Sequence, residues 1–163
     1  ILPDIIVDPG DYGMIIASLY RERLFFHYAN YFRFLNDTIS DNFMFSDLDF
    51  SNFTSYLSDK DYTYKTVTEK TLESFKKEAE QEGYFQDLSN EYAVLFDKML
   101  ANKNNDLNKS KDDIKQILTL EIMSRYYYQK GRIKASIKFD KEVEKAIEIL
   151  QNIENYNNIL FKK

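Results

Sequence analysis

Apolar side chains recur at helical spacing over the first part of the chain. Between Met14 and Phe34 they return every three or four positions, which predicts a long helix. Residues 36–46 are polar and interrupt the pattern. It restarts over 47–58 and predicts a shorter helix there, with one stripe of large side chains formed by Phe50, Phe53 and Leu57.

The middle of the chain carries signals for both ends of a further helix. Thr66 stands three residues before Glu69, which is the spacing of a capping box, and Gly83 follows the end of the helical pattern. Residues 59–65, which precede it, are expected to be extended or irregular. The next predicted helix has an amphipathic stripe made by Leu88, Tyr92, Leu95, Phe96 and Met99. We expect the polar stretch that follows it, 102–108, to be a mobile loop.

Two predicted N-caps organise the last third of the chain. Ser110, with Asp113 three residues later, predicts the start of a helix whose apolar stripe runs to residue 128, and we expect this helix to bend or break at Gly131. Asp140 is the predicted N-cap of a last helix, with a final turn or two at 156–161. The side chains of that last helix predicted to face inward are Val143, Ala146, Ile147 and Leu150.

The composition favours helices over strands. The 163 residues can bury one core, and four Gly with two Pro are too few for the many tight turns of an all-β fold. We predict an all-α fold: an irregular bundle of about five to seven helices behind a short extended N-terminal segment. Residues 1–13 are predicted to be that segment, because Pro3 and Pro9 oppose helix, and 14–163 a single helical domain.

Charge and cysteine content exclude several classes of function. Residues 1–85 carry 8 basic and 15 acidic side chains, whereas 86–163 carry 14 basic and 12 acidic, for a formal net charge of -5. This balance argues against a nucleic-acid binder. The absence of Cys excludes disulfides and thiolate metal sites, and no apolar run approaches the roughly 20 residues of a membrane span.

No group of residues predicts catalysis, a cofactor or a metal. His27 is the single His and has no partners at metal-ligand spacing, so it is interpreted as a packed or surface residue. The polar run 102–113 lacks the Gly and the closing Glu of a calcium loop. Three carboxylate pairs are interpreted as helix starts or solvated groups: Asp47 with Asp49, Asp59 with Asp61, and Asp112 with Asp113.

Two stretches of the chain, ILPDIIVDP at 1–9 and SRYYYQKGRIKASIKFD at 124–140, resemble the C-terminal region of carboxyl-terminal processing (tail-specific) proteases. In that family a segment similar to Leu2-Pro3-Asp4 follows the protease core, and some members continue into a helical extension with a run like Arg125 to Gly131. The resemblance covers the whole chain, and the second motif is the more specific. Because the chain opens on Ile1 without an initiator Met, we expect it to be a piece of a larger protein.

The resemblance implies a parent serine endopeptidase with a Ser nucleophile and a Lys base, usually with a PDZ domain that holds the C-terminus of the substrate. No position here matches those parts, since every Ser lies outside the tight Gly-containing turn that such a nucleophile needs. The chain is therefore expected to be inactive alone. Its implied role is structure, assembly or regulation of substrate access, in the periplasm or cell envelope.

The partners implied by the resemblance are the upstream protease and PDZ domains of the same chain, with another protomer or a protein substrate as further candidates. An alternative hypothesis is a stand-alone helical adaptor that binds a protein partner through its aromatic faces. The protease hypothesis predicts several hundred residues before Ile1 that include a nucleophilic Ser on a Gly-rich turn and a Lys base. The adaptor hypothesis predicts a native start, with its own Met, shortly before Ile1.

The window 125–138 is the best candidate for a docking surface. It holds five basic side chains and no acidic one, beside three consecutive tyrosines. Three successive residues cannot share one helix face, so we expect one or two tyrosines to enter the core and another to reach outward. The cations are expected to contact acidic helix faces or the protease body. The predicted docking residues are Arg125, Tyr126, Tyr127, Tyr128, Lys130 and Arg132.

Overall fold

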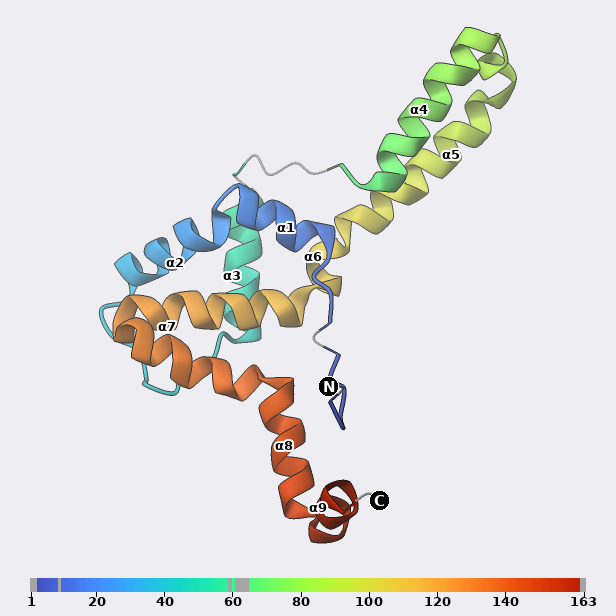
Figure 1. Cartoon of the computed structure of the whole chain (residues 1–163). Helices are drawn as coiled ribbons and strands as arrows, with labels where there is room; N and C mark the ends of the chain where they lie inside the picture. Colours follow the sequence, from blue (N-terminus) through green and yellow to red (C-terminus); the bar gives the residue numbers. More distant parts are fainter. Residues whose placement is uncertain (1–2, 9, 59, 61–64, 162–163) are drawn as a thin grey trace. The chain divides into compact units, whose positions relative to one another are not determined.

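The computed structural model of the chain describes residues 3–8, 10–58, 60 and 65–161. Across these residues the secondary structure is helical and no strand is present, so the all-α prediction is confirmed (Figure 1). The described part of 3–13 contains no helix, as predicted. The helices are α1 (Met14–Arg21), α2 (Leu24–Leu35), α3 (Asp47–Ser58), α4 (Val67–Glu82), α5 (Phe85–Asn104), α6 (Asp106–Lys109), α7 (Lys111–Ser136), the 3₁₀ turn η1 (Ile137–Phe139), α8 (Lys141–Gln151) and α9 (Ile153–Leu160).

The chain forms two compact units. The first consists of Ile1–Asp11, Phe25–Phe45 and Lys115–Lys163, and the second of Tyr12–Leu24 and Ser46–Ile114. Each unit contains its own set of buried apolar side chains. That 14–163 form a single helical domain stays a prediction.

The buried side chains of the first unit come mainly from α2 and α7. They recur at helical spacing on both helices, and each fully buried Ile, Leu, Met or Phe contributes on the order of 1.5–3 kcal/mol to folding. The ring of Tyr28 also meets that of Phe45 edge-on, with the ring centres 6.0 Å apart, which ties the loop after α2 to this core. The buried residues on the two helices are Phe25, Tyr28, Ala29, Ile117, Leu118, Ile122 and Met123.

The second unit contains the two elements whose bounds were predicted most closely. Helix α3 covers the predicted 47–58, and its predicted stripe is buried. The capping box of α4 is present: the backbone N–H of Glu69 donates to the hydroxyl of Thr66 at 3.0 Å, and the Glu69 carboxylate accepts from the Thr66 N–H. Gly83 ends the helix in the left-handed conformation, with φ of 81°. Of the predicted irregular stretch 59–65, residues 59 and 61–64 lie outside the described residues.

Two of the predicted element bounds are wrong. The long first helix is divided into α1 and α2 at Arg23, whose φ of 55° is left-handed and cannot continue a right-handed helix. The expected loop at 102–108 is largely helical, since α5 runs to Asn104 and α6 begins at Asp106. Local side-chain contacts support these turns: the Nζ of Lys109 donates to Asp106 Oδ1 at 2.9 Å and to the carbonyl of Asn102 at 3.1 Å.

The expected bend in α7 lies at Tyr128, three residues before the predicted Gly131. Tyr128 has φ of 55° and ψ of -153°, and beyond it α7 doubles back on itself (Figure 1). Gly131 is then buried against the first arm of the helix. A Cβ atom at this position would lie 2.3 Å from the Cβ of Tyr127 and 3.1 Å from the carbonyl oxygen of Met123, so only glycine fits.

Helix α8 begins at its predicted cap but buries a different side chain from those predicted. The carboxylate of Asp140 accepts from the backbone N–H groups of Glu142 and Val143. Of the four residues expected inside, Val143 is half-buried, and the buried residue is Ile149. The prediction is wrong because the helical stripe faces outward in this chain, which leaves exposed Ala146, Ile147 and Leu150.

Replacing Gly131 by Ala is expected to lower the free energy of unfolding by about 3 kcal/mol, because the new methyl group overlaps Tyr127 and the two arms of α7 must separate. Gly13→Ala is the control: a Cβ there would meet its nearest atom at 3.4 Å, an ordinary contact, and should cost about 0.5 kcal/mol. Urea unfolding followed by circular dichroism measures both. Equal unfolding midpoints for the two variants would contradict the close approach.

Candidate docking surface

Arg125 is held inside the first unit between α7 and α2. Its Nη1 donates to Glu121 Oε2 at 2.6 Å and its Nε to Asn30 Oδ1 at 3.1 Å, while the guanidinium stacks on the ring of Phe26, 4.8 Å from the ring centre. The side chain is only 15% exposed. Within the described residues its Nη2 has no hydrogen-bond acceptor. Arg125 therefore fixes α2 to α7 and offers little surface to a partner.

Glu121 joins the two arms of α7. Its Oε2 accepts from Arg125, which precedes the reversal at Tyr128, and its Oε1 accepts at 2.6 Å from the Nη1 of Arg132, which follows it. Burial alone would raise the pKa of this carboxyl group, but the hydrogen bonds from the two arginines outweigh it and hold the pKa below its ordinary value. The carboxylate therefore stays ionised and keeps the arms together at neutral pH.

Tyr126 and Tyr127 fix the loop between α2 and α3. Their hydroxyl groups donate to the carbonyl oxygens of Asn36 and Ile39 respectively, the second at 2.6 Å. Burial raises the pKa of Tyr126, although the guanidinium of Arg33 over its ring opposes the shift, so the hydroxyl group remains a donor.

The same loop is held at two more points. Lys134 Nζ donates to Asp41 Oδ2 at 2.7 Å, and the backbone N–H of Phe45 donates to Thr119 Oγ1 at 3.0 Å. With the two tyrosine contacts, helix α7 anchors residues 36–45 from end to end. Helix α2, the loop that follows it and helix α7 are thus joined by polar contacts within one unit.

The six predicted docking residues divide into two groups. Arg125, Tyr126, Tyr127 and Arg132 are engaged within the chain, as described above. Tyr128 is 79% exposed and Lys130 is also exposed, so these two are the members that face solvent. The expectation that some tyrosines pack and another reaches outward agrees with this arrangement. The docking role of the six residues stays a prediction.

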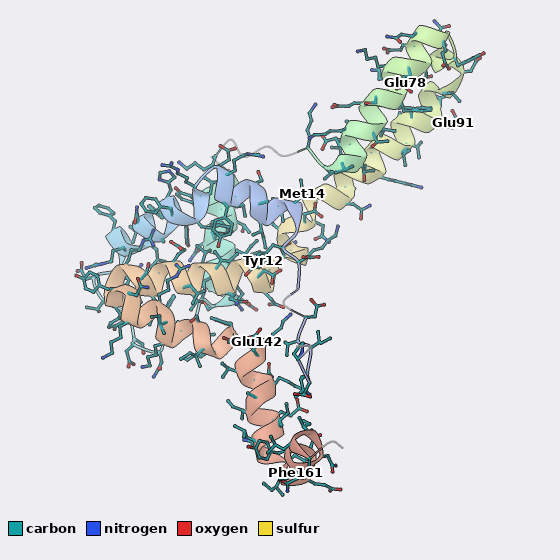
Figure 2. The ribbon with its side chains drawn as sticks, in the orientation of Figure 1. Tyr12, Met14, Glu78, Glu91, Glu142 and Phe161 are labelled. Carbon is teal, nitrogen blue, oxygen red and sulfur yellow. The ribbon has the colours of Figure 1, made fainter. Side chains whose placement is uncertain are left out.

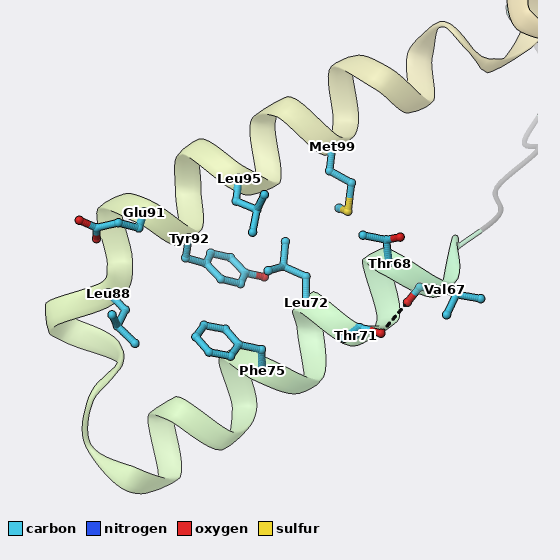
Figure 3. Close-up of a pocket in the computed structure, with 10 residues that line it drawn as sticks. All are labelled: Val67, Thr68, Thr71, Leu72, Phe75, Leu88, Glu91, Tyr92, Leu95 and Met99. Carbon is cyan, nitrogen blue, oxygen red and sulfur yellow. Dashed lines mark hydrogen bonds between the residues drawn. The ribbon is translucent and has the colours of Figure 1, made fainter.

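Two apolar surfaces outside the predicted window are exposed. One lies on α8 and α9, where the large side chains left in solvent are Ile147, Leu150, Ile153, Leu160 and, just beyond α9, Phe161. The other is a groove of about 540 Å³ between α4 and α5 (Figure 3). The sequence predicts that the stripe of α8 faces inward and that the stripe of α5 is amphipathic. Periodicity does not state whether the chain covers an apolar stripe, so the exposure of both could not be predicted from the pattern.

The absence of a metal or catalytic site stays a prediction. In the part of the chain that the structure describes, no three His, Cys, Asp or Glu side chains come together to hold a metal ion. Asp47 forms an ion pair with Lys111 at 3.1 Å, and the pair Asp112 and Asp113 lies in the first turn of α7, where the helix dipole stabilises acids. Asp59 and Asp61 lie outside the described residues.

Among the described residues, no helix has both the length and the apolar character needed to cross a bilayer.

A family model described as the C-terminal helical domain of a probable PDZ-protease matches residues 15–150. The chain belongs to this family. No curated protein and no solved structure matches the chain. Membership in the PDZ-protease helical domain family makes the protease and PDZ domains of the same chain its implied partners, and it agrees with the resemblance carried by residues 124–140. The match extends from α1 almost to the end of α8, so it includes the reversal of α7.

Glu121→Gln is expected to lower the free energy of unfolding by about 2 kcal/mol at pH 7, because it leaves Arg125 without its anionic partner. The loss should shrink in acid. A carboxylate with a lowered native pKa contributes stability above its ordinary value of 4.5, and that stability disappears as the pH falls through the native pKa. Urea unfolding from pH 7 to about pH 3 measures the difference.

Glu148→Gln is the control, since it breaks an exposed ion pair with Lys145 and should cost no more than about 0.5 kcal/mol. If the two variants lose the same stability and follow the same pH dependence, Glu121 does not join the arms of α7.

Proposed function

We propose that this domain is a non-catalytic packing and regulatory module of a serine-type carboxyl-terminal processing endopeptidase, located in the periplasm or cell envelope. Family membership supports a place behind the protease and PDZ domains of one chain. The resemblance of residues 124–140 to tail-specific proteases supports the reaction class and the location. In this proposal the domain binds the protease body and regulates the access of substrate C-termini to the active site.

The observation that carries the proposal is the apolar surface on α8 and α9. Leu150 is 64% exposed and Phe161 74% exposed, and the second is labelled at the end of α9 in Figure 2. Large apolar side chains left in solvent on two successive helices favour an interaction surface. The polar residues of α8, such as Glu142 and Glu148, are also exposed, so the helix presents both a charged and an apolar side to solvent.

The N-terminal segment supports the protease body as the partner of this surface. Lys141 Nζ, at the start of α8, lies 3.4 Å from the carbonyl oxygen of Asp8, and the Asp8 carboxylate accepts from the N–H of Gly10. The segment that leads into the domain therefore passes beside α8. In a C-terminal domain the preceding domains are attached through that segment, which brings the protease body close to the start of α8.

Leu150→Glu in the intact parent tests the proposal. A carboxylate at a docked apolar position must lose its hydration, so the variant should change kcat/KM for an unstructured C-terminal peptide by about tenfold or more. Leu48→Glu is the matched control: it places the same charge on an exposed leucine of α3, and it should leave cleavage unchanged. Both variants should unfold like the wild type in the isolated 163-residue chain, because both leucines are exposed there.

Removal of residues 14–163 from the parent should alter cleavage in the same direction as Leu150→Glu. The isolated chain should hydrolyse none of the same peptides. Equal activity and specificity of the full and truncated parent would make the domain a passive appendage, and hydrolysis by the isolated chain would refute the non-catalytic role.

A further inference from the structure

The groove between α4 and α5 is an apolar feature of the second unit that the interactions described so far leave unexplained. The two helices run antiparallel, and their facing side chains meet at Leu72, Phe75 and Tyr92 (Figure 3). Only Leu72 among these is buried. Phe75 is 46% exposed and Leu95 is 55% exposed, so one side of this helical hairpin is apolar and open to solvent.

Such a hairpin favours a further helix on its open side. Two helices can bury the stripe between them but cannot enclose it, and helical stability in proteins comes mainly from packing of the apolar face. On α5 the stripe along the groove has coiled-coil spacing, with Leu88, Tyr92, Leu95 and Met99 at alternating intervals of four and three. The groove therefore fits a helix of similar periodicity.

The charges beside this stripe indicate which helix would pack into the groove. Glu91 lines the groove, and Lys98 lines the adjoining hollow that shares Leu95 and Met99 with it. The two charges are seven residues apart and thus occupy the same heptad position, about 10 Å from each other along α5. Neither forms an ion pair within the described part of the chain.

The charges of Glu91 and Lys98 are self-complementary when two copies of α5 pack antiparallel. When two copies of α5 lie antiparallel about a two-fold axis near Val94 and Leu95, Glu91 of each copy faces Lys98 of the other. Two ion pairs then flank an apolar centre, and flanking ion pairs of this kind set the partner and the orientation of packed helices. Closed two-fold pairing is also the commonest symmetry of protein oligomers.

We propose that the α4–α5 hairpin binds a second copy of this chain, with α5 antiparallel to α5 and with Glu91 paired to Lys98 across the two-fold axis. The two hairpins together form a four-helix bundle whose core contains the groove residues Phe75, Leu88, Leu95 and Met99. This inference does not depend on the proposed docking of α8, because the hairpin and α8 belong to different units.

Sedimentation equilibrium of the 163-residue chain tests the pairing. The chain has a mass of 19.5 kDa, and the wild type should sediment with twice this mass at concentrations up to about 100 μM. Glu91→Lys and Lys98→Glu should each weaken the dimer about tenfold or more, since each places like charges opposite one another. The double variant Glu91→Lys with Lys98→Glu should restore the dimer.

Mixing the two single variants gives the sharpest result. A chain with Glu91→Lys carries two cations on the stripe, and a chain with Lys98→Glu carries two anions, so an equimolar mixture should form a heterodimer, which native mass spectrometry detects. Lys77→Glu and Glu78→Lys on α4 are the matched controls. Both residues are exposed and neither lines the groove, so both variants should dimerise like the wild type.

Three outcomes would overturn the proposal: a wild-type chain that stays monomeric at about 100 μM, a dimer that is indifferent to both charge reversals, or single variants that do not form a heterodimer. A monomeric chain combined with an effect of Glu91→Lys on cleavage by the intact parent would instead assign the groove to the protease body. Circular dichroism of each variant verifies that its helices are intact.

Discussion

The contact of Glu121 with two arginines is the interaction on which the first unit depends. It joins residues on either side of a reversal that the backbone does not favour, because Tyr128 occupies a conformation that costs about 1–3 kcal/mol in a residue with a bulky side chain. The buried Gly131 allows the arms to approach, and the carboxylate holds them there. The first arm then carries Tyr126 and Tyr127, which fix the preceding loop. A local strain is thus maintained by contacts that reach across the unit.

Local signals in the sequence predicted those elements that are determined locally. The Thr66 capping box, the Gly83 terminus and the Asp140 cap each involve residues within a few positions of one another, and all three are present. The division of the first helix at Arg23 has no such signal, because no Gly, Pro or Asn stands there. Similarly, the run of Asn and Lys at 102–108 resembles a loop in composition, whereas its side chains are close enough along a helix to support one.

The sequence singles out the window 125–138 but does not give its contacts. The tyrosine and arginine window is identified by its composition, yet Asn30, which binds Arg125, and Asn36, which binds Tyr126, lie 95 and 90 residues away and cannot be inferred from spacing. Periodicity identifies an apolar stripe and does not state whether the chain itself covers it. For that reason the stripe of α8 is predicted to face inward, although Leu150 is exposed, and the amphipathic stripe of α5 is predicted without the finding that Leu95 is exposed. Exposed stripes of this kind fit a domain that completes its packing against other parts of a larger assembly.

Amide hydrogen exchange tests the central claim, that the domain binds the protease body through α8 and α9. The exchange rates of these helices are compared between the isolated chain and the intact parent, with the first arm of α7 as an internal reference. The account predicts that amides of α8 and α9 exchange at least about tenfold more slowly in the parent, while those around Ile122 and Met123 exchange alike in both. Equal exchange of α8 and α9 in the two proteins would contradict the account.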